Sequence, residues 1–331
     1  ALDEANTPAL AVETSGGFGD GFHWELDDNG VLTITGAGPM PDFAYGSTPW
    51  SDNKINVKKI VISEGVTSIG SYAFNNCPGL TGITIPDSVT DIRSYAFNNC
   101  PSLTEITIPG NVWNIEIGAF SNCTSLTEVS IPESVTSIGY GAFFSCENLD
   151  KVIFAGTTPP TLRGDIFKST SKSLQLVFPN APVTFPAGGN WPLEKVVVSG
   201  AVAQVVKQDG TTPYVANLAE AFADANSGAT VTMLADVTLT EMVEIPQDTT
   251  FVLDLNGHTI SNPTESCIFV KYGGTLTIRD SGTGGTVTSA GDAVYVSGTA
   301  KLEGGRFETK DPGSCTGING LGNLIVTGDS V

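Results

Sequence analysis

The chain has 331 residues, of which 38 are glycine and 19 are proline, and only 15% are charged. This composition favours an all-β chain with many turns over a helical bundle. Acidic residues outnumber Lys and Arg by 35 to 15, which argues against partners such as nucleic acid or an anionic membrane surface. No apolar run approaches the ~18 residues of a membrane span, so no membrane insertion is expected.

The N-terminal residues 1–17 are small or polar and have no packing pattern. Such a segment is typical of a mature N-terminus left after a signal peptide is removed, and it is predicted to be disordered. The next segment predicts a hairpin that turns at Asp28-Asn29-Gly30. The aromatic residues of this region are expected to cover the end of the fold that follows; they are Trp24, Phe43, Tyr45 and Trp50.

A repeat of 23 residues organises the chain from about residue 58. Several residue types recur at this interval in register, and each series predicts a column of stacked side chains. The columns are Cys77, Cys100, Cys123 and Cys146; Phe74, Phe97, Phe120 and Phe143; Leu80, Leu103, Leu126 and Leu149; and Ile60, Ile83, Ile106, Val129 and Val152. A degenerate further unit carries Ile166 and Phe167 near the expected Ala-Phe position and lacks the cysteine.

Each unit begins with a segment such as LTEITIP, in which apolar and polar residues alternate. This alternation predicts a strand with one buried face, which the following proline ends. A second short strand is predicted in VTSIG, and a short helical turn in SYAFNNC. One unit cannot bury its apolar side alone, so the units are expected to stack into a solenoid.

The repeat resembles the BspA-type leucine-rich repeat of bacterial surface proteins over about Ile60–Val177. The resemblance implies an N-terminal cap at 18–57 and a leucine-rich repeat domain at 58–200, with residues 178–202 and Trp191 closing its far end. It also implies a secreted or cell-surface bacterial protein, because the family is associated with adhesion to host or matrix proteins and between bacteria.

The region 203–331 lacks the 23-residue motif. It predicts first a helix with Leu218, Phe222 and Ala225 on one face, ended by Gly228. Short strands follow, with leucines at looser steps of 23, 26 and 22 residues at Leu253, Leu276, Leu302 and Leu324. The region resembles the right-handed parallel β-helix domains, pectate-lyase-like in fold, of secreted bacterial proteins. Because the chain stops just after a strand-like run, a truncated C-terminus is expected.

The six cysteines predict neither a metal site nor disulfides. Zinc ligands must converge on a point, whereas a fixed repeat step places the four in-register thiols in a ladder and points them the same way. Buried free thiols are expected, also for Cys267 and Cys315. The two histidines, His23 and His258, fall in different domains, so no cofactor and no metal is predicted.

A β-helix can carry polysaccharide-cleaving chemistry, which needs clustered carboxylates or a basic residue beside them. The candidates for this alternative are Asp254, Arg279, Asp280, Asp292, Glu303 and Arg306. Arg279 and Asp280 are neighbours in the sequence and point to opposite faces of a strand, so they form no obvious pair. The sequence therefore favours a protein without enzymatic activity.

The candidate binding surface is the solvent-facing side of the repeat strands. It consists of the hydroxyl column Thr84, Thr107 and Ser130, the acidic positions Glu105 and Glu128, and Trp113. Trp113 replaces the threonine of the other repeats, so it either contacts a ligand or fills a core gap. The function expected is that of a monomeric binding or adhesion protein for a protein or glycan ligand. The alternatives are a carbohydrate-active β-helix with the repeats as an accessory module, and a structural spacer.

Overall fold

The computed structural model describes residues 13–223, 228–309 and 318–327. The described chain is mainly β and forms two compact units. The repeat unit comprises the chain up to Val177 together with Asn190–Val197. The C-terminal unit comprises Phe178–Gly189 and the chain from Val198 onward.

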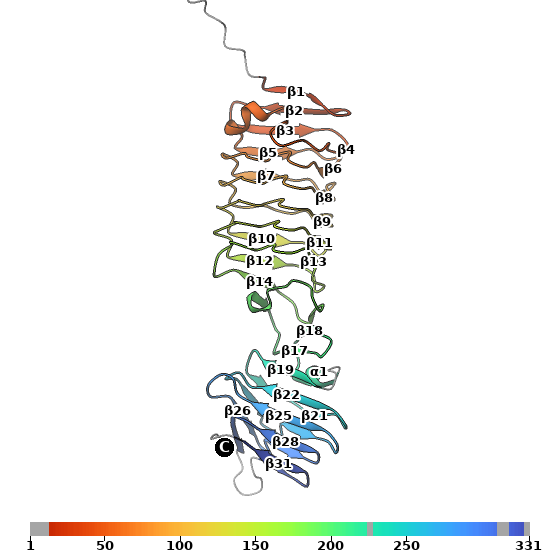
Figure 1. The fold of residues 1–331 in the computed structure, drawn as a ribbon, viewed down its shortest axis with the longest axis vertical. Helices are drawn as coiled ribbons and strands as arrows, with labels where there is room; N and C mark the ends of the chain where they lie inside the picture. Colours follow the sequence, from red (N-terminus) through yellow and green to blue (C-terminus); the bar gives the residue numbers. More distant parts are fainter. Residues whose placement is uncertain (1–12, 224–227, 310–317, 328–331) are drawn as a thin grey trace, which may run out of the picture. The chain divides into compact units, whose positions relative to one another are not determined.

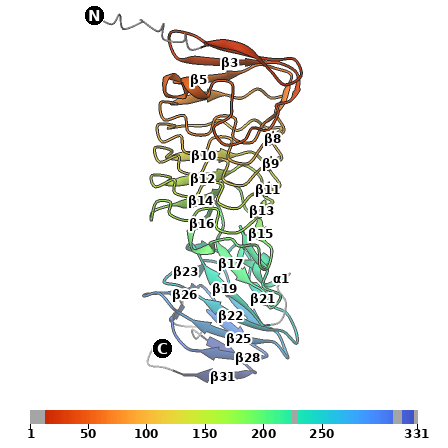
Figure 2. The ribbon, with the colours of Figure 1, turned by 45° about the horizontal axis from the view of Figure 1, so that its top comes forward.

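The repeat unit is a parallel β-solenoid in which the 23-residue repeats place their strands in two columns, visible apart in Figure 2. The first column and its cap comprise β1 (Ser15–Phe18), β2 (Phe22–Leu26), β3 (Val31–Thr35), β5 (Lys59–Ile62), β7 (Gly82–Thr84), β10 (Glu128–Ile131), β12 (Lys151–Phe154) and β14 (Gln175–Phe178). The second comprises β4 (Gly38–Pro39), β6 (Val66–Ile69), β8 (Asp91–Ile92), β9 (Asn114–Ile115), β11 (Ser137–Ile138) and β13 (Thr161–Leu162). In the first column β16 (Val196–Val198) follows β14. The unit also contains two 3-10 helices, η1 (Ser51–Asn56) and η2 (Leu193–Lys195).

Successive repeats pair in register, which confirms the repeat period as a structural step. In the second column Asp91 pairs with Asn114, and Asn114 pairs with Ser137. Within β10 the side chains of Val129 and Ile131 are buried, while those of Glu128 and Ser130 are exposed. The alternation predicted for this segment is therefore confirmed.

The repeat core is built from columns of identical side chains. The rings of Phe74, Phe97, Phe120 and Phe143 stack with centroids 5.4 Å apart and interplanar angles of 18°, 4° and 11°. Phe167 continues this stack on Phe143 at 5.9 Å, so the degenerate unit keeps its predicted place. Offset stacking of this kind adds about 0.5–1.5 kcal/mol per pair to the burial of the rings.

The helical turn predicted at SYAFNNC is wrong. Tyr72 and Asn76 adopt positive φ angles of 57° and 60°, which an α-helix does not allow. Alternate N–H groups instead donate to the next repeat, from Tyr72 to Ser94, from Phe74 to Ala96 and from Asn76 to Asn98. The N–H groups between them donate within the rung, from Ala73 to Gly70 and from Asn75 to Tyr72, so the segment is a ladder of turns and not a helix.

The predicted hairpin of the cap is confirmed, since β2 and β3 pair antiparallel with Trp24 opposite Ile34. Residues 15–17, expected to be disordered, lie in β1, which pairs with β2 and leads to Phe18. The Phe18 ring packs 5.3 Å from that of Trp50, and this contact explains why the strand is ordered. Residues 1–12 of the same prediction lie outside the described residues.

The prediction that Tyr45 covers the open end is wrong, because this residue is 73% exposed. It leans edge-on against Tyr72, outside the core.

The C-terminal unit starts with antiparallel strands and continues as a parallel β-solenoid with three sheets (Figure 1). The first sheet runs in the order β15 (Val183–Phe185), β18 (Thr212–Val215), β17 (Ala203–Val206), β19 (Ala229–Met233), β22 (Thr250–Asp254), β25 (Thr275–Arg279), β28 (Thr299–Leu302) and β31 (Asn323–Val326). The second holds β20 (Val237–Thr238), β23 (Thr259–Asn262), β26 (Thr286–Ser289) and β29 (Arg306–Thr309), and the third β21 (Val243–Ile245), β24 (Ile268–Val270), β27 (Val294–Val296) and β30 (Ile318–Gly320).

A helix, α1 (Leu218–Ala223), lies where the sequence predicts one and buries Leu218 and Phe222. The predicted third member of that face, Ala225, lies outside the described residues.

The leucines that suggest rungs in the sequence do not form one column. Leu253 pairs with Ile278, and Leu276 pairs with Phe251 on one side and with Ala300 on the other. The shift is two residues, which keeps Leu253, Leu276 and Leu302 on the buried face, since side chains alternate with a period of two. Loops of unequal length between the rungs account for the difference.

The boundary between the units differs from the expected one near residues 200–203. Residues 178–189 belong to the C-terminal unit, where β15 pairs antiparallel with β18 through Val183 and Tyr214. Only Asn190–Val197 pack with the repeats, and the Trp191 ring lies 5.1 Å from that of Phe154.

Candidate binding surface of the repeat unit

The first column presents the predicted hydroxyl and acidic residues on its outer face. Thr107 and Ser130 form a parallel bridge, so their side chains lie one above the other, and Thr84 occupies the same position one repeat earlier. Glu105 and Glu128 are exposed beside this column. The Glu128 carboxylate lies 3.2 Å from the Lys151 ammonium, which offsets part of the acidity of this face.

Trp113 lies on the other column, so the structure does not bring it together with the five residues above. It directly precedes β9. Its backbone N–H donates to the Thr90 carbonyl, and its backbone carbonyl accepts from the Thr136 N–H. The side chain is 49% exposed. Trp113 therefore does not fill a core gap, and the alternative that it faces a ligand stays open.

A shallow groove of about 290 Å³ runs beside Trp113. Ile117, which is 45% exposed, lines the groove with Trp113, and Tyr140 follows at the same position one repeat later and is 52% exposed. We call Trp113, Ile117 and Tyr140 the aromatic surface. Sequence reasoning missed its last two members, although they replace the serines Ser71 and Ser94 of the earlier repeats.

Polar groups with fixed orientations border this groove. The Glu116 carboxylate accepts hydrogen bonds from the Ser94 hydroxyl at 2.7 Å and from the Ser94 N–H at 3.0 Å. Arg163 donates from Nε to the Ser137 hydroxyl at 3.1 Å. Such bonds hold the two charged side chains in place, so the groove offers one acceptor and one donor group of defined position.

The four in-register thiols are buried and point along the column. Cys100, Cys123 and Cys146 donate from Sγ to the carbonyl oxygens of Phe74, Phe97 and Phe120 at 3.3, 3.3 and 3.2 Å. Burial raises the pKa of Cys146 to about 12 and that of Cys123 still further. Cys123 and Cys146 therefore stay protonated at neutral pH, when they are poor nucleophiles and poor metal ligands.

The carboxylates considered for the enzymatic alternative serve turns of the C-terminal unit. Asp254 is buried and accepts from Arg279 Nε at 2.9 Å and from the Ser281 N–H at 2.9 Å. Asp280 accepts from the N–H groups of Gly257 and Gly285 at 2.7 and 2.8 Å.

The other candidates are separate from this pair. Glu303 is exposed, Arg306 forms an ion pair with Glu308, and Asp292 is buried with Ser266 Oγ bonded to its N–H. The predicted set therefore does not converge on one point. Within the described ranges, no three His, Cys, Asp or Glu side chains are arranged to hold a metal ion.

The histidines lie in different units, as their sequence positions suggest. His258 Nδ1 lies 3.3 Å from the Asp236 carboxylate, and the Thr259 N–H donates to the same carboxylate at 2.8 Å. This arrangement orders a turn between two rungs. Among the helices of the described residues, none has the length and apolarity needed to cross a membrane.

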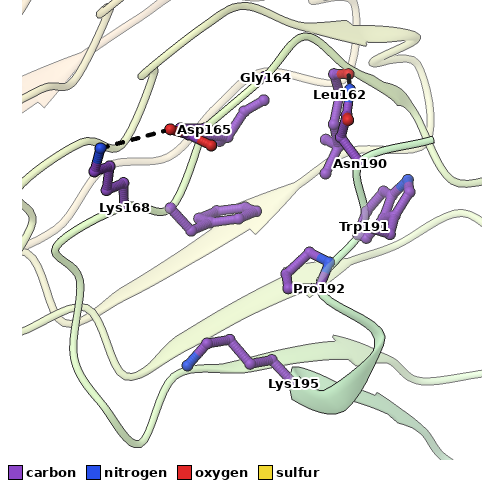
Figure 3. A pocket seen from close by; sticks show the side chains of 10 residues that line it. Leu162, Gly164, Asp165, Lys168, Asn190, Trp191, Pro192 and Lys195 are labelled. Atoms are coloured by element: carbon purple, nitrogen blue, oxygen red, sulfur yellow. Dashed lines mark hydrogen bonds and ion pairs between the residues drawn. The ribbon is translucent and has the colours of Figure 1, made fainter. Parts of the chain in front are cut away.

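A second concavity, of about 380 Å³, lies at the end of the repeat stack (Figure 3). Its apolar wall includes Ile166, Phe167, Trp191 and Pro192. Asp165, Lys168 and Lys195 surround it with charge, and the Asp165 carboxylate lies 3.7 Å from the Lys168 ammonium. Sequence reasoning missed this pocket, because its two walls come from segments that the fold alone brings together.

Residues 51–174 match the BspA type Leucine rich repeat region in 6 copies. The match confirms the leucine-rich repeat prediction for this part of the chain. No curated protein matches the chain.

Three similar solved structures are leucine-rich repeat proteins. The T. pallidum Leucine Rich Repeat protein is 27% identical, with 48% of this chain and 79% of that chain covered and a TM-score of 0.36. A leucine-rich repeat protein from Eubacterium ventriosum is 18% identical, with 88% and 80% covered and a TM-score of 0.38. A leucine rich cell surface protein from Faecalibacterium prausnitzii is 19% identical, with 94% and 95% covered and a TM-score of 0.36.

Proposed function

We propose that this protein is a secreted or cell-surface bacterial binding protein whose repeat unit holds a protein or glycan ligand on its aromatic surface. The observation that carries the proposal is the exposure of Trp113, 49%, at a position where neighbouring repeats carry threonine. An exposed indole is unfavourable in water, and exposed apolar clusters rimmed by polar groups are typical of interaction sites. The match of residues 51–174 to BspA-type repeats supports the assignment to the cell surface.

The chemistry of the groove suits a ligand with both a flat apolar face and hydrogen-bonding groups. Trp113 offers an aromatic face, while Glu116 and Arg163 offer an acceptor and a donor on the same groove. Aromatic side chains and Arg contribute most of the binding energy in many protein interfaces, and sugar rings stack on indoles in the same way. A sugar chain or an extended peptide segment meets these requirements.

The hydroxyl column Thr84, Thr107 and Ser130 is proposed as a second contact face, with Glu105 and Glu128 beside it. These side chains are exposed and aligned by the repeat step, so one ligand could contact several of them at equal intervals. The Lys151 ammonium lies 3.2 Å from the Glu128 carboxylate, so this ion pair is part of the charge pattern of the face.

The C-terminal unit is proposed to be a right-handed parallel β-helix without catalytic function. Its three stacked parallel sheets support the β-helix, and the use of Asp254 and Asp280 as turn acceptors supports a structural role for both. Its contribution would be to present the repeat unit to its ligand.

A binding screen tests the proposal. The full chain is passed over immobilised matrix proteins and a glycan array, next to Trp113→Thr, which restores the residue of the other repeats. Ile55→Thr is the control, because Ile55 is 74% exposed in the same unit and does not line the groove beside Trp113. We expect Trp113→Thr to lose at least tenfold in affinity and Ile55→Thr to bind normally. Silence of the wild-type chain in the whole screen, or equal binding by both variants, would contradict the proposal.

A further inference from the structure

The phenylalanine stack of the repeat unit ends at an open pocket. Each ring from Phe74 to Phe143 has a phenylalanine of the next repeat on its far side. Phe167 is the last ring, and among the described residues no further ring stacks on it. Phe167 also lines the 380 Å³ pocket, so the last ring of the column forms part of the pocket wall.

The opposite wall of this pocket comes from the returning segment Asn190–Val197. Asn190 adopts a positive φ of 56° and donates from Nδ2 to the Leu162 carbonyl at 3.2 Å, which ties this segment to β13. The tie places Trp191 and Pro192 at the pocket, as Figure 3 shows. The volume lies at the lower end of the range for small-molecule sites, about 300–1,000 Å³, and fits one fused ring system with a short side group.

The charge at the pocket is positive, although the chain as a whole is acidic. Lys168 is paired with Asp165 at 3.7 Å, while Lys195 has no carboxylate within ion-pair distance among the described residues. In the view of Figure 3 both lysines lie on the side of the pocket away from Trp191. An unpaired ammonium next to an apolar wall favours a ligand that carries an anion on one side and a ring on the other.

From these observations we infer that the pocket binds a small aromatic carboxylate. The ring of the ligand adds the next member to the phenylalanine stack beyond Phe167, and its carboxylate pairs with Lys195. The site is distinct from the groove beside Trp113, because the pocket and the groove share no lining residue. Failure of this inference would therefore leave the proposed function unaffected, and failure of the proposed function would leave this inference unaffected.

Titrations followed by NMR test this inference. The probes are indole-3-acetate, its neutral amide indole-3-acetamide, and acetate, added to the full chain. The readout is the indole N–H resonance of Trp191, assigned by its loss in Trp191→Phe. We expect the acid to shift this resonance, the amide to bind at least fivefold more weakly, and acetate to cause no shift at millimolar concentration.

Two lysine variants complete the experiment. Lys195→Gln should weaken the acid about tenfold, to the level of the amide, and leave binding of the amide unchanged. Lys172→Gln is the matched control, since Lys172 is exposed and lies outside the pocket. Equal affinities of the acid and the amide would overturn the inference. So would an unmoved Trp191 resonance, or equal effects of the two lysine variants.

Discussion

Tyr140 packs directly over Gly164, where a Cβ atom would come within 2.7 Å of the tyrosine ring. Gly164 has a φ of 90°, a backbone conformation that residues with a side chain rarely adopt. The absence of a side chain at Gly164 thus allows Tyr140 to lie across the next repeat. The same relation holds between Tyr95 and Gly118, whose Cβ would lie 2.4 Å from the ring.

Gly164→Ala should therefore displace the Tyr140 ring and strain the backbone. We expect a loss of about 1–2 kcal/mol in the free energy of unfolding, measured by urea denaturation. In a Tyr140→Ala background the same substitution should cost less, because only the backbone strain remains. An identical loss of unfolding free energy in both backgrounds would contradict the contact between the Tyr140 ring and Gly164.

Phe120→Ala should be among the most destabilising single changes in the repeat unit. Phe120 is fully buried between Phe97 and Phe143, so truncation leaves a cavity that its neighbours fill only in part. The expected loss is about 3–5 kcal/mol, with a smaller loss for Phe120→Leu. Phe144→Ala, at a half-buried position in the same repeat, is the control. Equal losses for Phe120→Ala and Phe144→Ala in denaturant titrations would contradict the stacked core.

The repeat columns could be predicted from the sequence because a fixed step converts spacing directly into contact. Once Phe97 and Phe120 are 23 residues apart in a solenoid, their rings must be neighbours. The alternation at Val129 and Ile131 is equally local, since neighbouring side chains on a strand face opposite ways. Both predictions needed no knowledge of distant segments.

The features that the sequence did not reveal depend on contacts between distant segments or on backbone angles. The positive φ of Tyr72 turns an expected helical turn into a ladder, and tyrosine gives no sign of this. One wall of the pocket at Phe167 comes from a segment that Asn190 ties to Leu162 across 28 residues. The sequence shows that Trp113 replaces the threonine of the other repeats. Its exposure, however, depends on how the neighbouring repeats pack around it, which the sequence does not show.

Alkaline pH should destabilise the protein through its buried thiols. Burial raises the pKa of Cys146 and of Cys267 to about 12 from the 9.0 expected in the unfolded chain. Between pH 9 and 12 the unfolded state releases protons that the folded state retains, so stability falls as pH rises. Each such thiol contributes a slope of up to ~1.4 kcal/mol per pH unit in this window.

Cys146→Ala should flatten this alkaline slope, which urea titrations at pH 8, 9 and 10 measure. A slope unchanged by the substitution would contradict the assignment.

The denatured, unreduced chain should also yield six alkylatable thiols, including Cys315, which lies outside the described residues. A count of two or fewer would contradict the prediction that no disulfides form.

Asp254→Asn should loosen the turns of the C-terminal unit without affecting ligand binding. Burial raises the pKa of Asp254, but hydrogen bonds from Ser281, Asn256 and Arg279 outweigh this effect and hold the pKa below its ordinary value of 3.8. We expect a loss of about 1–3 kcal/mol, read as faster hydrogen exchange at the Ser281 amide. Glu303→Gln, at an exposed position of the same unit, should change nothing.

The depressed pKa of Asp254 stabilises the fold above about pH 3.8, and this contribution is lost as pH falls below that value. The difference in protection between wild type and Asp254→Asn should therefore narrow in acid. A difference that stays constant down to pH 2 would show that the charge of Asp254 is not its source.

The central claim is that the repeat unit binds its ligand on the aromatic surface, and hydrogen exchange in the presence of the ligand found by the screen tests it most directly. We predict slower exchange in the amides around Trp113, Ile117 and Tyr140, absent when Trp113→Thr is used. Protection confined to the C-terminal unit, with the amides of residues 113–140 unchanged, would contradict the account.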